Sequence, residues 1–166
     1  MQEYVIDRQQ LLSWCTIPIE ELAEHPQRKC EIMIEQDKQK LFDYIGNTMA
    51  DELLAHNREG KLTKWILPSG HLDQYHVFAK RVNTERIDCS GLHIFHMDDW
   101  LDWQFRPMPA EKSFVSARSI MKHGFYDLID PELAIPEENR HWPDVHDPDA
   151  IDALIEQMGG IDTVQG

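Results

Sequence analysis

Apolar residues recur every three or four positions over one long stretch of the chain, beginning at Asp37. This spacing produces one buried stripe on a helix, and Gly60 is expected to end it. Shorter stretches with the same spacing predict helices over residues 72–81 and 111–125. A last helix is predicted after Asp147, because Asp is a favoured N-cap residue.

Four short apolar runs lie between and around these helices and are expected to form strands. They cover residues 31–34, 65–67, 92–97 and 161–164. Strands that alternate with helices pair in parallel, and the helices then cover the faces of the sheet. The pattern therefore predicts an α/β fold built on a parallel sheet.

The first thirty residues do not follow this alternation and are interpreted as an N-terminal arm. They contain one predicted short helix around residues 16–22, with Pro18 in its first turn and acidic residues after it. The predicted organisation is thus an arm over residues 1–30 and one α/β domain over residues 31–166.

Composition and charge narrow the classes of partner. The 166 residues suit a single domain. The 30 Asp and Glu residues outnumber the 16 Lys and Arg residues, which gives a net charge of −14. This charge repels phosphate backbones and anionic lipid, so no nucleic-acid or membrane partner is expected. Cys15, Cys30 and Cys89 have no CxxC spacing and are expected to be reduced thiols of a cytoplasmic protein.

The carboxyl ends of parallel strands meet at one edge of the sheet, where folds of this kind bind ligands. We call it the ligand edge. Ser69 and Gly70 follow the predicted strand 65–67, so a hydroxyl and backbone N–H groups could face an anion there. An ordinary turn in which Ser69 caps the next helix also fits this spacing.

Two adjacent acidic residues, Asp98 and Asp99, follow the predicted strand 92–97. One carboxylate is expected to face the ligand edge and the other to point aside. A carboxylate at that edge can act as a general base, although Asp also commonly starts a turn. Trp100 and Trp103 flank the pair, either as a surface on which a sugar stacks or as packing residues.

Several histidines also fall near this edge in the sequence, namely His71, His76, His93 and His96. Their spacing lacks the pattern of a zinc site, and His93 and His96 should point to opposite faces of their strand. We therefore predict structural histidines bonded to backbone groups, and no metal.

Five segments follow the order found in one enzyme family. They are Ile66-Leu67-Pro68-Ser69-Gly70, Phe95-His96-Met97-Asp98-Asp99-Trp100, Ser113-Phe114 with the helix to Phe125-Tyr126, Ile135-Pro136-Glu137-Glu138-Asn139, and Ile161 to Gly166. In this order they resemble the glucosamine-6-phosphate isomerase/deaminase family, over roughly residues 31–166.

The resemblance implies a three-layer, modified Rossmann-like parallel sheet with helices on both faces, truncated after the fourth recognisable strand. It also implies an enzyme of amino-sugar metabolism with no organic cofactor. The family opens an amino-sugar phosphate, moves a proton between C2 and C1, and releases ammonia to leave fructose 6-phosphate. Asp98 would be the base, Ser69, Gly70 and His71 would lie around the phosphate, and Asp99 and Trp100 would support the site.

The chain departs from the family pattern in two places. The small residue that follows Ser-Gly in the family is His71 here, and Asp73 adds a negative charge nearby. Because a bulky side chain keeps the backbone away from a phosphate, we expect a weaker preference for phosphorylated over free sugar than in the family. In the family the ring-opening histidine lies in a segment that would follow Gly166, so we expect these 166 residues alone to bind sugar poorly, to catalyse nothing and to release no ammonia.

Two other functions fit the same residues. A 6-phosphogluconolactonase-like hydrolase has the same architecture, and a non-catalytic sugar-phosphate sensor would need no proton transfer. The segment before Cys30 carries few cations, which disfavours a DNA-binding helix-turn-helix. The sequence leaves open which sugar phosphate is bound and whether the chain forms a homo-oligomer.

Overall fold

A computed structural model describes residues 6–109 and 116–165 of the chain. By its contacts the chain divides into two units, Met1–Lys38 and Gln39–Gly166. The first unit contains α1 (Arg8–Cys15) and α2 (Ile19–Leu22). The short helix predicted around residues 16–22 is present as α2, which begins after Pro18, whereas the sequence pattern did not predict α1.

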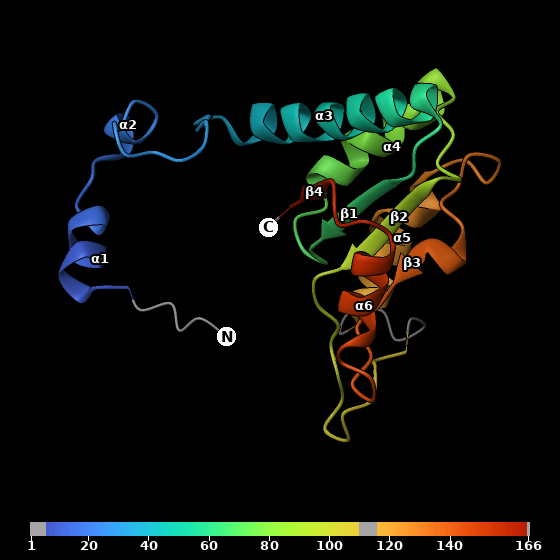
Figure 1. The fold of residues 1–166 in the computed structure, drawn as a ribbon. Coiled ribbons are helices and arrows are strands. Elements are labelled where there is room, and N and C mark those ends of the chain that lie inside the picture. Colours follow the sequence, from blue (N-terminus) through green and yellow to red (C-terminus); the bar gives the residue numbers. More distant parts are fainter. Residues whose placement is uncertain (1–5, 110–115, 166) are drawn as a thin grey trace. The chain divides into compact units, whose positions relative to one another are not determined.

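The second unit is built on one four-stranded sheet (Figure 1). Its strands are β1 (Thr63–Leu67), β2 (Leu92–His96), β3 (Arg140–His141) and β4 (Thr163–Val164). They lie in the order β3-β2-β1-β4, and every neighbouring pair is parallel. The predicted parallel sheet is confirmed.

One predicted strand is wrong and one observed strand was missed. Residues 31–34 form no strand, and Met33 and Ile34 are exposed, because no neighbouring strand pairs with this segment. The missed strand, β3, has two polar residues, so it lacks the apolar run that marked the others. It is defined by its pairing with β2, where Arg140 lies opposite Ile94.

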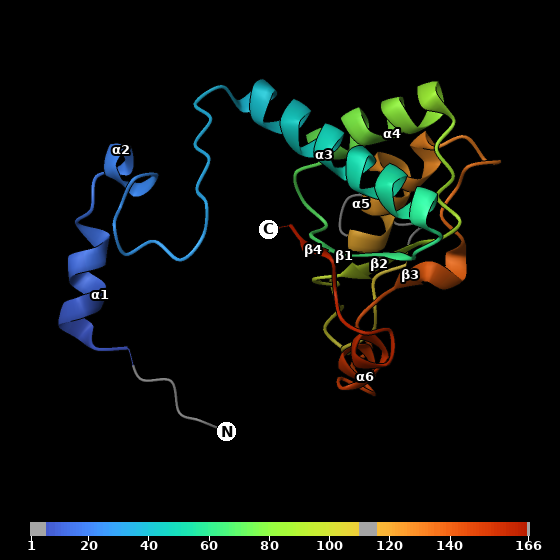
Figure 2. The ribbon, with the colours of Figure 1, turned by 45° about the horizontal axis from the view of Figure 1, so that its top comes forward.

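Helices cover both faces of the sheet (Figure 2). On one face lie α3 (Lys38–Glu59), α4 (Asp73–Glu85) and α5 (Ala117–Gly124), and on the other lies α6 (Ala150–Gln157). This is the three-layer α/β arrangement that was predicted. Two 3-10 turns, η1 (Tyr126–Leu128) and η2 (Glu137–Asn139), complete the described elements.

Two helix boundaries differ from the prediction, and a third falls partly outside the described residues. The helix predicted over residues 72–81 runs on to Glu85 as α4. Asp149, and not Asp147, is the N-cap of α6; Asp147 lies in the preceding turn, where its backbone oxygen accepts from Ala150 N at 3.2 Å. The predicted helix over residues 111–125 is described only from Ala117 as α5, so Ser113 and Phe114 lie outside the described residues.

The core lies between the sheet and the three helices α3, α4 and α5 that cover one of its faces. Trp65 on β1 is fully buried and meets Phe78 of α4 edge to face, with ring centroids 5.6 Å apart. Phe125, at the end of α5, packs on Tyr75 of α4 at 4.7 Å. These rings supply much of the buried apolar area that holds the three helices to the sheet.

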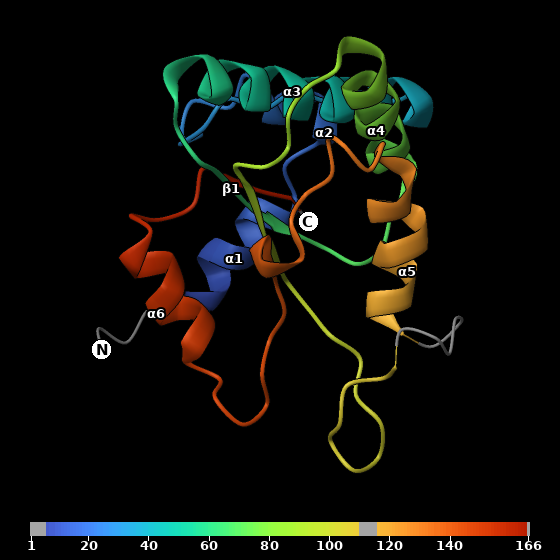
Figure 3. The ribbon, with the colours of Figure 1, turned by 90° about the vertical axis from the view of Figure 1, so that its right-hand side faces the viewer.

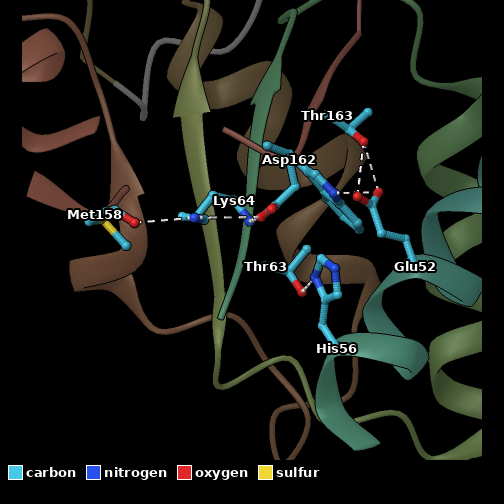
Figure 4. Close-up of polar contacts among 8 residues, drawn as sticks. Glu52, His56, Thr63, Lys64, Met158, Asp162 and Thr163 are labelled. Carbon is cyan, nitrogen blue, oxygen red and sulfur yellow. Dashed lines mark hydrogen bonds and ion pairs between the residues drawn. The ribbon is translucent and has the colours of Figure 1, made fainter. Parts of the chain in front are cut away.

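Polar contacts attach β4 to β1 and α3 (Figure 4). Glu52 of α3 accepts hydrogen bonds from Trp65 Nε1 at 2.9 Å and from Thr163 Oγ1 at 2.9 and 3.0 Å. The backbone N–H of Lys64 donates to Asp162 Oδ2 at 2.8 Å. A strand of only two residues is thereby fixed beside β1, so that the chain after it reaches the ligand edge.

Gly46 lets α3 and α4 approach closely. A Cβ atom at this position would lie 2.6 Å from the backbone oxygen of Gln74 and 2.7 Å from the Cβ of Val77. Gly46→Ala is therefore expected to lower the free energy of unfolding by about 1 to 3 kcal/mol, although Ala favours a helix. Urea denaturation measures this. Gly91→Ala, where the nearest atom is 3.7 Å away, is the control, and equal stability of the two variants would contradict the expectation.

Candidate functional site

The loops after β1 and β2 meet at the ligand edge, as expected from the parallel sheet. Asp98 Oδ1 accepts a hydrogen bond from the backbone N–H of Ser69 at 3.3 Å. Asp98 Oδ2 accepts from Trp100 Nε1 at 3.2 Å. Asp98 is half-buried, so its carboxylate is held by two donors and is still reached by solvent.

The neighbouring carboxylate, Asp99, has different surroundings. Its side chain is only 2% exposed, and its Oδ2 accepts from Arg118 Nε at 2.8 Å. The guanidinium of Arg118 also lies over the ring of Trp142, 5.1 Å from its centroid. Asp99 therefore forms a buried ion pair with α5, whereas Asp98 stays at the ligand edge.

The loop at residues 68–71 keeps the Ser69 hydroxyl buried and exposes His71. Ser69 is 1% exposed, and its Oγ has no hydrogen-bond partner among the described residues. His71 is exposed and has a φ of 49°. A Cβ on Gly70 would meet no protein atom within 4 Å, so the protein leaves this side of the Gly70 backbone open. Ser69 also does not cap α4, whose N-cap is Leu72.

A buried aromatic cluster lies directly under this edge. His96, the last residue of β2, is 3% exposed, and its Nε2 lies 2.7 Å from the hydroxyl of Tyr126. Its ring stacks on Trp142 with a centroid distance of 3.4 Å. Burial, and then the positive charge of Arg118, lower the pKa of His96 to about 3. His96 is therefore neutral at physiological pH.

The other strand histidine pairs on a different part of the sheet. His93 Nδ1 lies 3.1 Å from His141 Nε2, and burial lowers the pKa of both rings. His93 and His96 thus have separate partners, as their opposite orientations predicted. The prediction that backbone groups bind these histidines is wrong, because the partners are the side chains of His141 and Tyr126. Among the described residues, no three His, Cys, Asp or Glu side chains gather as metal ligands.

Of the two tryptophans beside the acidic pair, only Trp100 contacts it. Residues 101–107 form a short hairpin, closed by an antiparallel bridge between Leu101 and Pro107. Trp103, in this hairpin, is 86% exposed. Figure 3 shows the segment after β2, in yellow, extending away from the sheet. Trp103 therefore does not line a pocket at Asp98.

A groove of about 540 Å³ opens next to the ligand edge. The apolar wall comes from Tyr44, Ile45 and other side chains of α3, and the loop residues His71 and Gln165 also line it. The third segment expected at this edge, which follows β4, thus reaches it through Gln165, while Gly166 lies outside the described residues. The groove has room for a small molecule beside the loop at residues 68–71.

Sequence reasoning missed three residues next to the site. Arg118, Trp142 and Tyr126 are brought to Asp99 and His96 by the fold, from positions 19 to 46 residues away along the chain. Trp142 follows the unpredicted strand β3. No short spacing in the sequence marks these pairings, so only the folded structure reveals them.

Two further features bear on what kind of protein this is. No helix in the described part of the chain is both long and apolar enough to cross a membrane. All three cysteines are free, with Cys15 and Cys30 exposed and Cys89 buried. Burial raises the pKa of the Cys89 thiol to about 12, so that thiol is not a ready nucleophile.

Comparison with known proteins identifies the fold. No protein-family model and no curated protein matches the sequence. A solved monomeric glucosamine-6-phosphate deaminase matches with a TM-score of 0.61 and 16% identity, over 80% of this chain and 53% of that one. A 6-phosphogluconolactonase from Thermotoga maritima matches with a TM-score of 0.45 and 18% identity, over 70% of this chain and 47% of that one. The chain spans about half the length of both structures. It therefore shares its α/β fold with a glucosamine-6-phosphate deaminase.

Proposed function

We propose that the chain takes part in an aldose–ketose isomerisation of an amino-sugar phosphate, with Asp98 as the base and ammonia as the leaving group. The observation that carries this proposal is the position of Asp98. Its carboxylate lies at the ligand edge, held by the Ser69 N–H and the Trp100 indole. A fixed, solvent-reached carboxylate at that place suits removal of a proton from a carbon next to a carbonyl.

The proposed chemistry follows from that carboxylate. In the open-chain sugar, Asp98 takes the proton from C2, the electron pair of the C–H bond forms a C1–C2 double bond, and the π pair of the C1 carbonyl moves to O1. O1 takes up a solvent proton, which is given back when ammonia leaves. The same carboxylic acid then returns the proton to C1, which leaves an iminium group at C2. Water adds to C2 and ammonia leaves, so fructose 6-phosphate is formed. One proton is moved, one water is consumed and one ammonia is released.

The proposal is supported by two further features. The deaminase fold match is consistent with a sugar phosphate as ligand. Asp99 is already neutralised by Arg118, so a second free carboxylate does not compete with Asp98. The two adjacent acids would then have separate tasks, proton transfer for Asp98 and local structure for Asp99.

The proton transfer is the step to test, because its proposed base, Asp98, is among the described residues. The chain is incubated with glucosamine 6-phosphate in D₂O, and deuterium at C2 is followed by proton NMR. Although the sequence resemblance led us to expect no catalysis by these residues alone, proton removal by Asp98 needs only the open-chain form of the sugar. We therefore expect deuterium to enter C2 faster than in buffer alone. If C2 keeps its hydrogen while the chain hydrolyses 6-phosphogluconolactone, the lactonase alternative replaces the proposal. Binding of the sugar without either reaction would favour the sensor alternative.

A further inference from the structure

Arg118 is held in a fixed orientation at the ligand edge. Its Nε donates to Asp99 Oδ2 at 2.8 Å, and its guanidinium lies 5.1 Å from the centroid of the Trp142 ring. An aromatic face and a buried carboxylate together restrict a side chain that is otherwise among the most mobile. The Arg118 side chain has therefore already lost conformational entropy before any ligand binds.

Part of the guanidinium remains free to bind a ligand. The Arg118 side chain is 34% exposed. Only its Nε has a hydrogen-bond partner among the described residues, which leaves the two terminal nitrogens as donors. Planar guanidinium groups bind phosphate through two parallel hydrogen bonds. Arg118 can therefore hold Asp99 with one side of its fork and an anion with the other.

Arg118 is linked to the end of the sheet that carries the proposed base through its two partners. Asp99, the partner of Arg118, is the residue next to Asp98, and Trp142 directly follows β3. Both partners thus lie at the carboxyl ends of the strands. A ligand whose C2 carbon lies at Asp98 would extend along the same edge that carries the free side of Arg118.

Ser69, in the loop after β1, is a poor donor to an anion. The Ser69 N–H is already bonded to Asp98, and the Ser69 hydroxyl is buried. Arg106, another cation that follows β2, is used within the hairpin, where its side chain makes two hydrogen bonds to Asp102 at 2.7 and 2.9 Å. An anionic group in this acidic region therefore needs a donor that is local and not already used.

We propose that Arg118 binds the phosphate group of the sugar substrate and so determines the preference for a phosphorylated over a free sugar. This inference rests on the proposed function, because it concerns the same site and the same substrate class. It places the phosphate near α5, on the β3 side of Asp98, and not on the loop at residues 68–71. The segment around Arg118 was not among the residues that the sequence resemblance marked for phosphate binding.

The test compares two ligands and two matched variants of the whole chain. Affinities for glucosamine 6-phosphate and for glucosamine are measured by isothermal titration calorimetry or NMR titration, with inorganic phosphate as a third probe. Arg118→Gln should weaken binding of the phosphorylated sugar by about 10- to 100-fold, the range expected for hydrogen bonds to a charged group. Its affinity for glucosamine should stay within about twofold, and Arg118→Lys should keep part of the preference.

Arg81→Gln is the control, since Arg81 also forms ion pairs, with Asp51 and Glu85, but away from this edge. It should leave both affinities unchanged. A loss of both ligands in Arg118→Gln would show that the arginine only supports the loop, and would overturn the inference. An unchanged preference in Arg118→Gln would overturn it as well. If the unmodified chain binds neither sugar, the proposed function itself fails, which is a different result.

Discussion

Asp98→Asn is expected to reduce deuterium incorporation at C2 of glucosamine 6-phosphate by about 10²- to 10⁴-fold, the usual contribution of a positioned general base. The amide cannot accept the proton, while its shape is nearly that of the acid. It also offers only one acceptor to the two donors that hold Asp98, Ser69 N and Trp100 Nε1. A modest loss of stability, about 1 kcal/mol, is therefore expected beside the large loss of proton transfer.

A matched control separates these two effects. Asp88 is also a loop aspartate that accepts two hydrogen bonds, from the Ser90 backbone N–H and from the Ser90 hydroxyl, both at 2.8 Å. It precedes β2, and so it lies at the opposite end of the sheet from Asp98. Asp88→Asn should cost similar stability and leave the exchange rate unchanged. Exchange that persists in Asp98→Asn at the original rate would remove Asp98 from the role of base.

The main elements of the second unit could be predicted because their signals are local. The stripe of α3 needs only a repeat of three or four residues, and the apolar run of β1 is bounded by a Pro-Ser-Gly turn. The same reasoning predicted the end of β2 to within one residue, at Met97 where the structure has His96, and with it the meeting of the two loops. Parallel pairing then placed Ser69 and Asp98 at one edge, because crossover helices return the chain to the same end of the sheet.

The remaining features depend on contacts between distant parts of the chain. β3 is a strand only because it pairs with β2, and residues 31–34 are not one because nothing pairs with them. The buried ion pair of Asp99 with Arg118 joins the end of β2 to α5. His96 was expected to bond to backbone, but the fold places Tyr126 and Trp142 around it. Such partners are brought together by tertiary packing, and they cannot be predicted from local patterns in a single sequence.

The partners of His96 make the stability of the fold sensitive to acid. In the unfolded chain a histidine takes up a proton near its ordinary pKa of 6.5, whereas the folded chain protonates His96 only near pH 3. Below about pH 6.5 the unfolded state therefore binds more protons, and the free energy of unfolding falls as the pH falls. From pH 6.5 to pH 4 this one group is expected to remove about 3 kcal/mol, a large share of the stability of a small domain.

His96→Phe should remove this contribution and so flatten the pH dependence of unfolding between pH 6.5 and pH 4. The phenyl ring can still stack on Trp142, but it cannot be protonated, and Tyr126 loses its hydrogen-bond partner. The variant should thus be less stable than the original chain at pH 7 by about 1 to 3 kcal/mol, with a difference that shrinks or reverses at pH 4. Urea midpoints across this range measure it, with the exposed His76→Gln as control. If the free energy of unfolding of His96→Phe and of the original chain depends on pH in the same way, His96 has the same pKa in the folded and unfolded states. That result would contradict the expectation that folding lowers this pKa.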